Sequence, residues 1–73
     1  MNNRYQLIGK REDKVIEECS EVIQAIVKIK NFGLFNYHPA RPESSNRIEV
    51  LGEIADLRLA LNQYEDELLK AQP

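Results

Sequence analysis

Two pairs of acidic residues share one spacing at separate places in the chain. Glu18 and Glu21 are three residues apart, and so are Glu53 and Asp56. On an α-helix, residues three apart lie on one flank, about 60° round the axis and one turn along. Each pair would therefore present two carboxylates on one side of its helix.

Four carboxylates that converge from two helices cost free energy unless cations neutralise them. Divalent ions with oxygen ligands are the natural partners, and Mg²⁺ favours a few carboxylates together with substrate phosphates. Glu17 lies further round towards solvent, where it is a candidate to orient a water molecule or accept its proton. Acidic pairs with this spacing are also common on solvated helix faces, so spacing alone leaves both interpretations open.

The elements that must position these acids follow from the hydrophobic pattern, which predicts an all-α protein. One helix is expected over about residues 5–32 and a second over about residues 46–70, with a loop at residues 33–45. Each helix carries a broad apolar stripe, and the acidic pairs begin at the rims of these stripes. The first stripe contains Val15, Cys19, Val22, Ile26 and Ile29, widened by Ile16, Ile23 and Val27; the second contains Val50, Ile54, Leu57, Leu61, Tyr64 and Leu68.

Local signals mark the ends of the two helices. Gly33 is suited to stop the first, because glycine adopts positive φ at little cost. Pro39 and Pro42 interrupt the loop. Asn46 is expected to cap the second helix, with Glu49 completing a capping pair.

Size and composition limit the class of protein. A chain of 73 residues forms one small domain with little core, and a lone Cys19 excludes an internal disulfide. Two helices with wide stripes cannot cover each other, so we expect an antiparallel hairpin that completes a four-helix-type bundle as a homodimer or homotetramer. Cys19 is expected to be a small core residue.

The same composition argues against several partners. The net charge of −2 gives no reason to expect nucleic-acid binding. Apolar runs are too short to span a membrane, and the N-terminal segment lacks the apolar core of a signal peptide. We therefore expect a cytoplasmic protein.

The order of the acidic motifs resembles a known family. Glu17-Glu18-Cys19-Ser20-Glu21, followed by Glu53-Ile54-Ala55-Asp56, is similar to the paired EExxE and ExxD signature of the MazG-like all-alpha nucleoside triphosphate pyrophosphohydrolases. The similarity covers roughly residues 14–68 and is nearest to the short phage-type members.

The resemblance implies a fold, a reaction and a set of ligands. The fold would be antiparallel helices assembled into dimers or tetramers. The reaction would cleave an NTP or dNTP between the α and β phosphates, which yields a monophosphate and pyrophosphate. Glu18, Glu21, Glu53 and Asp56 would hold Mg²⁺, with Mn²⁺ as an alternative, and Glu17 would assist as a further ligand or through water.

Other residues are candidates for contacts with the substrate. Lys28, Asn46 and Arg47 are expected to bind it, with Lys28 the best placed for phosphate because it shares a side of its helix with Glu21. A lysine near a helix C-terminus also stabilises the helix dipole, and Asn46 is first a cap. Tyr37, His38 and Arg41, all in the loop, are further candidates for contact with a base or phosphate.

Two functions of different class remain open from the sequence. One is the Mg²⁺-dependent pyrophosphohydrolase. The other is a non-catalytic helical-hairpin adaptor, or a degenerate family member, whose acids form a solvated face.

Overall fold

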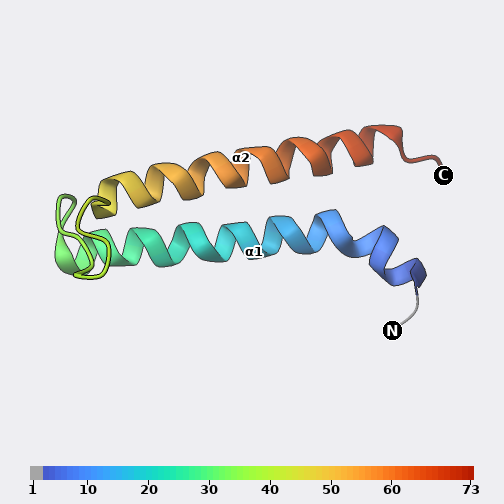
Figure 1. Ribbon diagram of the computed structural model, residues 1–73. Helices are drawn as coiled ribbons and strands as arrows, with labels where there is room; N and C mark the ends of the chain where they lie inside the picture. Colours follow the sequence, from blue (N-terminus) through green and yellow to red (C-terminus); the bar gives the residue numbers. More distant parts are fainter. Residues whose placement is uncertain (1–2) are drawn as a thin grey trace.

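The computed structural model describes the backbone of residues 3–73 and the side chains from Lys10 onwards. Helix α1 spans Asn3–Phe32 and α2 spans Asn46–Lys70, and the two lie side by side as an antiparallel hairpin (Figure 1). The hairpin is elongated, with extents of 48 × 26 × 19 Å. The expected all-α hairpin is confirmed, and both helices begin and end within two residues of their predicted limits.

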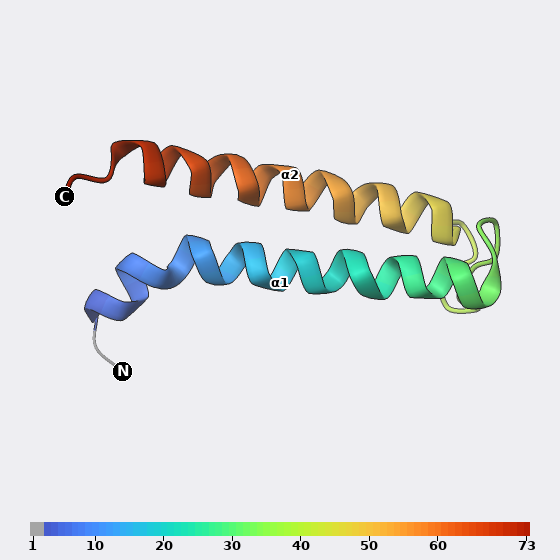
Figure 2. The same cartoon turned by 180° about the vertical axis from the view of Figure 1, so that it is seen from behind.

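The first turns of α1 depart from the line of the hairpin. They bend away from α2 in both opposite views (Figures 1 and 2). The sequence left open whether residues 1–10 continue this helix. The backbone from Asn3 belongs to α1, and residues 1–2 lie outside the described residues.

Backbone hydrogen bonds end α1 and fix the loop that follows it. Gly33 has φ of 93°, and its N–H donates to Ile29 O at 2.8 Å, as predicted for a glycine that stops a helix. Across the loop, Asn46 N donates to Asn36 O and Arg47 N to Leu34 O. The loop is thereby attached to the first turn of α2.

The predicted cap of α2 is wrong by one residue. Ser45 is the N-cap, and its hydroxyl accepts a hydrogen bond from Ile48 N. Asn46 is the first helical residue and its side chain is buried, where Nδ2 donates to Gly33 O at 2.9 Å. That bond joins the two helix ends, so the Asn46 amide serves the hairpin turn while the neighbouring serine caps the helix.

The helices pack along one edge of their apolar stripes, where the stripe residues are half-buried. Among residues 10–73, the buried apolar side chains are Ala25 and Ala60, and the buried polar ones are Glu18 and Asn46. Small side chains at the contact let two helices approach closely. The middle of the first stripe is therefore uncovered, and Cys19, expected in the core, is exposed in the single chain.

Much of each apolar stripe remains exposed to solvent. Ile23 is 62% exposed, Ile26 45%, Leu61 45% and Leu68 57%. These residues lie on the flank of each helix away from the acidic pairs. Across the described residues, however, neither helix has the length and apolar content that crossing a membrane requires.

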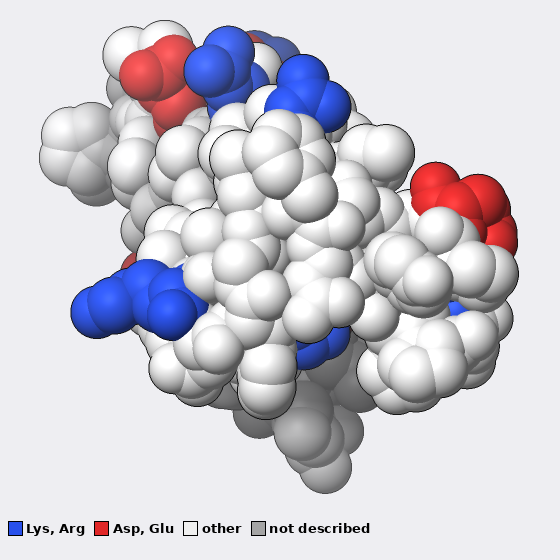
Figure 3. All heavy atoms as spheres, turned by 90° about the vertical axis from the view of Figure 1, so that its left-hand side faces the viewer, with Lys and Arg blue, Asp and Glu red and all other residues white. Residues whose placement is uncertain are grey.

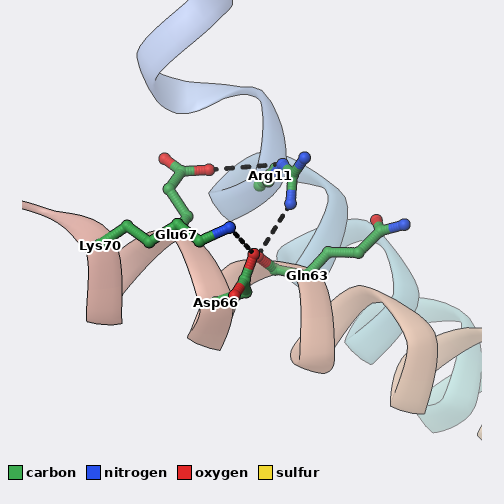
Figure 4. Close-up of polar contacts among 5 residues, drawn as sticks. All are labelled: Arg11, Gln63, Asp66, Glu67 and Lys70. Carbon is green, nitrogen blue, oxygen red and sulfur yellow. Dashed lines mark hydrogen bonds and ion pairs between the residues drawn. The ribbon is translucent and has the colours of Figure 1, made fainter.

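Polar contacts join the helices at the open end of the hairpin (Figure 4). Arg11 on α1 donates to Gln63 O at 3.0 Å and lies 3.6 Å from Glu67. Nearby, Tyr64 on α2 donates to Glu12 at 2.9 Å. These contacts hold the two helices together at the open end and so help to maintain the alignment of residues between them.

Candidate metal centre

Carboxylates from both helices meet midway along the hairpin. Oxygens of Glu18, Glu53 and Asp56 lie within 4.8 Å of one another. A second group on α1, Glu17, Glu18 and Glu21, meets the same limit. Glu18 belongs to both groups, so the structure brings all five acidic residues of the two motifs into one cluster, which we call the acid cluster.

The centre of the acid cluster is buried and not satisfied by the protein. Glu18 retains only 4% of its exposure, and its Oε2 has no hydrogen-bond partner among the described residues. The same is true of the buried Oε2 of Glu53, across the helix contact. A buried charged oxygen without a partner is costly, because it has lost its water and gained nothing in return. Two such oxygens make the acid cluster a candidate cation site.

A lysine supplies part of the missing positive charge. Lys14 Nζ lies 3.0 Å from Glu18 Oε1 and 3.7 Å from Glu17 Oε2. Its hydrogen bond to Glu18 and the charge of Glu17 raise the pKa of Lys14 above 10.5. The lysine remains half exposed, and it satisfies only one of the two Glu18 oxygens.

The negative charge of the acid cluster also affects the titration of Glu21. The hydrogen bond with Glu53, followed by the charge of Glu18, raises the pKa of Glu21 from 4.5 to about 7. Neighbouring carboxylates repel one another when both are ionised, so a proton on one of them lowers the repulsion. The raised pKa values of Lys14 and Glu21 both reflect the negative charge of the acid cluster.

A cavity of about 420 Å³ opens beside the acid cluster. Its wall contains Glu21 and Glu53 from the cluster, together with Lys28 and Arg41. Arg41 reaches it from the loop and is held by Glu49, with 2.9 Å between Nε and Oε1. The cavity therefore combines carboxylates that can hold a cation with basic groups that can hold phosphate oxygens.

A smaller cavity of about 220 Å³ adjoins the other side of the acid cluster. It is lined by Glu18 and Asp56, with Lys14 and the apolar Leu59 and Ala60. The acid cluster is therefore accessible from two sides despite the burial of its central glutamate.

The residues expected to bind the substrate fall in different places. Lys28 lines the 420 Å³ cavity, as its position relative to Glu21 predicts. Asn46 lies further towards the loop, where its buried side chain lines a third cavity. Arg47 is exposed, about 120° round α2 from Glu53, and lines none of these cavities.

Two charged residues of the site, Lys14 and Glu49, were not among the expected site residues. Lys14 is spaced three and four residues from Glu17 and Glu18, a helical pairing visible in the sequence. Arg41 was expected as a loop residue that contacts a base or phosphate, and Glu49 only as part of a cap. Their pairing across eight residues depends on the path of the loop, which no sequence spacing reveals.

The chain was also compared with known proteins. No protein-family model, no curated protein and no solved structure matches it. The assignment of function therefore depends on the residues and geometry of the site.

Proposed function

We propose that this chain is a Mg²⁺-dependent nucleoside triphosphate pyrophosphohydrolase, which converts an NTP or dNTP to a monophosphate and pyrophosphate. The observation that carries the proposal is the acid cluster, with the buried oxygens of Glu18 and Glu53 at its centre, which have no hydrogen-bond partner among the described side chains. Most acidic pairs on helices are solvated, whereas these oxygens are removed from water. That arrangement favours a cation site over a solvated face.

The residues of the acid cluster would have different roles in the reaction. Glu18, Glu21, Glu53 and Asp56 would hold Mg²⁺ or Mn²⁺, which when bound offsets phosphate charge and activates water. Glu17 is the exposed member of the acid cluster, so it would orient a water molecule or accept its proton.

The basic residues of the 420 Å³ cavity would hold the polyphosphate. Lys28 offers an ammonium group, and Arg41 offers a guanidinium group that can donate to two oxygens at once. Glu49 keeps Arg41 at the cavity wall before the substrate arrives.

Mg²⁺ binding is tested by the stability of the protein. Unfolding is measured with and without millimolar Mg²⁺, because a ligand at 100 times its Kd adds about 2.7 kcal/mol to the free energy of unfolding. We expect stabilisation of the wild type that Glu18→Gln removes. Asp66→Asn is a matched control, since Asp66 pairs with Lys70 at the open end of the hairpin.

The chemistry is tested by the products released from a panel of nucleoside triphosphates. We expect pyrophosphate rather than orthophosphate, and a loss of about 100-fold or more in Glu18→Gln and Asp56→Asn. Asp66→Asn should retain wild-type activity. Activity that survives both cluster substitutions would refute the ligand assignment.

We further propose that the chain works as a homodimer or homotetramer in the cytoplasm, where its nucleotide substrates are. The exposed stripe residues Ile23, Ile26, Leu61 and Leu68 support the assembly. They belong to the apolar stripes of a hairpin whose own buried apolar side chains, among residues 10–73, are two alanines. A second hairpin with the same surface would complete a four-helix bundle.

The second candidate is a non-catalytic helical-hairpin adaptor. It is favoured by the ion pairs of Lys14, which already neutralise part of the acid cluster without any metal. An adaptor should show neither selective stabilisation by Mg²⁺ nor release of pyrophosphate.

A further inference from the structure

A cavity of about 220 Å³ lies where the loop meets the end of α1. Its lining is mainly apolar and includes the rings of Phe32, Tyr37, His38 and Pro39. Phe32 is 64% and Tyr37 52% exposed, so both rings have free area to cover a ligand. Seen from the loop end, the surface consists mostly of uncharged residues (Figure 3).

The loop that builds this cavity is held in shape. Tyr37 pairs with Ser45 in an isolated bridge, and Asn36 O accepts from Asn46 N at 2.8 Å. His38 closes the next turn, since its carbonyl accepts from Arg41 N and its Nδ1 accepts from Ala40 N. A wall with this many internal bonds is formed before a ligand arrives, as is usual for small-molecule sites.

Polar groups at the edge of the cavity suit a nitrogen heterocycle. Because Nδ1 of His38 accepts a hydrogen bond, the neutral imidazole carries its proton on Nε2 and offers a donor there. Asn46 uses Nδ2 on Gly33 O, so its Oδ1 is the acceptor that it can offer. One donor and one acceptor beside aromatic rings match the edge and faces of a base.

The position of the cavity indicates what else the ligand carries. Lys28 and Glu49 line both this cavity and the 420 Å³ cavity beside the acid cluster. The two therefore adjoin, with the aromatic one at the loop and the charged one towards the cluster. A cavity of 220 Å³ is smaller than the roughly 300–1,000 Å³ of sites that take a whole drug-sized molecule, which favours one ring system as its occupant.

We infer that the loop cavity is the base subsite of a nucleotide whose phosphates lie in the adjoining charged cavity. The base stacks on Tyr37 and Phe32, and Lys28 lies at the junction between base and phosphates. This inference rests on the proposed function, since it takes a nucleoside triphosphate as the ligand.

The test compares two ligands with equal numbers of phosphates, both in millimolar Mg²⁺. One is a nucleoside triphosphate analogue with a methylene group between the α and β phosphorus atoms, in adenosine and uridine forms. The other is inorganic triphosphate. Affinities are measured by calorimetry for the wild type, Tyr37→Ala, Phe32→Ala and the control Phe35→Ala, which alters an exposed loop ring outside the cavity lining.

We expect Tyr37→Ala and Phe32→Ala each to weaken at least one nucleotide analogue about tenfold or more, as for loss of a stacking ring. Their affinity for inorganic triphosphate should stay within twofold of wild type, which also shows that the variants fold. Phe35→Ala should change neither affinity.

The opposite outcomes separate this inference from the proposed function. If every variant binds the nucleotide analogues and inorganic triphosphate with wild-type affinity, the base subsite is overturned but the phosphate site is left intact. A change in sedimentation of Tyr37→Ala without a change in nucleotide affinity assigns the cavity to a contact between subunits and also overturns the subsite. If wild type binds neither ligand, the proposed function fails together with the inference.

Discussion

Individual side chains of the acid cluster show how the protein manages charge without a metal. Glu18 is buried, and Lys14 neutralises one of its oxygens while the other has no partner among the described residues. Hydrogen bonding with Glu53 and the charge of Glu18 raise the pKa of Glu21 to about 7. The charge of Lys14 and the raised pKa of Glu21 both reduce the repulsion in the acid cluster, and a bound divalent cation would replace them.

The raised pKa of Glu21 predicts how the stability of the metal-free protein depends on pH. The folded state keeps a proton up to about pH 7 that the unfolded state loses near 4.5, so the free energy of unfolding should fall as pH rises through this window. Urea unfolding at pH 5 and pH 8 in a chelator measures the difference. Glu21→Gln should reduce it, and millimolar Mg²⁺ should restore stability at pH 8; equal pH dependence in the variant would contradict the assignment.

In the proposed metal site, Lys14 would compete with a divalent ion for Glu18. Lys14→Gln should therefore raise the affinity for Mg²⁺ severalfold, because a positive charge 3.0 Å from Glu18 Oε1 is removed. Calorimetric titration with Mg²⁺ measures the effect. Lys70→Gln, which breaks an exposed pair of the same spacing at the open end, should leave the affinity unchanged; a weaker affinity in Lys14→Gln would mean that the lysine organises the site rather than competes for it.

The helices and their turn place these side chains opposite one another. Gly33 reverses the chain with positive φ, and the buried Asn46 amide bonds back to the Gly33 carbonyl. At the other end, Arg11 binds the α2 backbone (Figure 4). Because both ends are fixed, the residue alignment between α1 and α2 puts Glu18 against Glu53 and Asp56.

Gly33, at the turn, and Gly52, within α2, provide a matched test of how the backbone of the hairpin affects stability. Gly33→Ala should lower the free energy of unfolding by about 1–2 kcal/mol, since a Cβ disfavours its positive φ even though the space around it is open. Gly52→Ala should raise it by about 0.5–1 kcal/mol, because Gly52 lies inside α2 with nothing within 4 Å of a new Cβ. Chemical unfolding of both variants measures the pair, and a destabilised Gly52→Ala would indicate a close neighbour in an assembly.

At the scale of the whole molecule, the hairpin has two unlike sides. One side carries the acid cluster and its cavities, and the other carries the exposed parts of the apolar stripes. Burial of two alanines provides little hydrophobic stabilisation, since this term grows with the apolar area removed from water. We therefore expect the hairpin to be more stable when its apolar side is covered, as in the proposed assembly.

Assembly predicts that stability depends on concentration. The Tm should rise with protein concentration, and Ile26→Glu or Leu61→Glu should reduce the sedimenting mass to that of one chain and lower the Tm. Leu69→Glu is the control, since Leu69 is 78% exposed near the end of α2 and lies outside the stripe. A wild type that sediments as one chain at all concentrations would exclude the oligomer.

Much of the architecture was predictable from the sequence because it depends on local chemistry. Helical periodicity, the glycine stop and the capping residues act within a few positions, so the limits of both helices were predicted closely and the cap was missed by one residue. The spacing of Glu18 with Glu21, and of Glu53 with Asp56, placed each pair on one flank for the same reason.

The rotation of each helix about its axis was decided only by tertiary packing. Contact through Ala25 and Ala60 turns inwards the line on each helix where the apolar stripe meets the acidic flank. Glu18 is therefore buried, and Cys19 is exposed. The loop likewise brought Arg41 to Glu49 and the cavity wall while Arg47 points elsewhere. Periodicity defines which residues share a face, but the face that meets its neighbour depends on contacts between residues far apart in the chain.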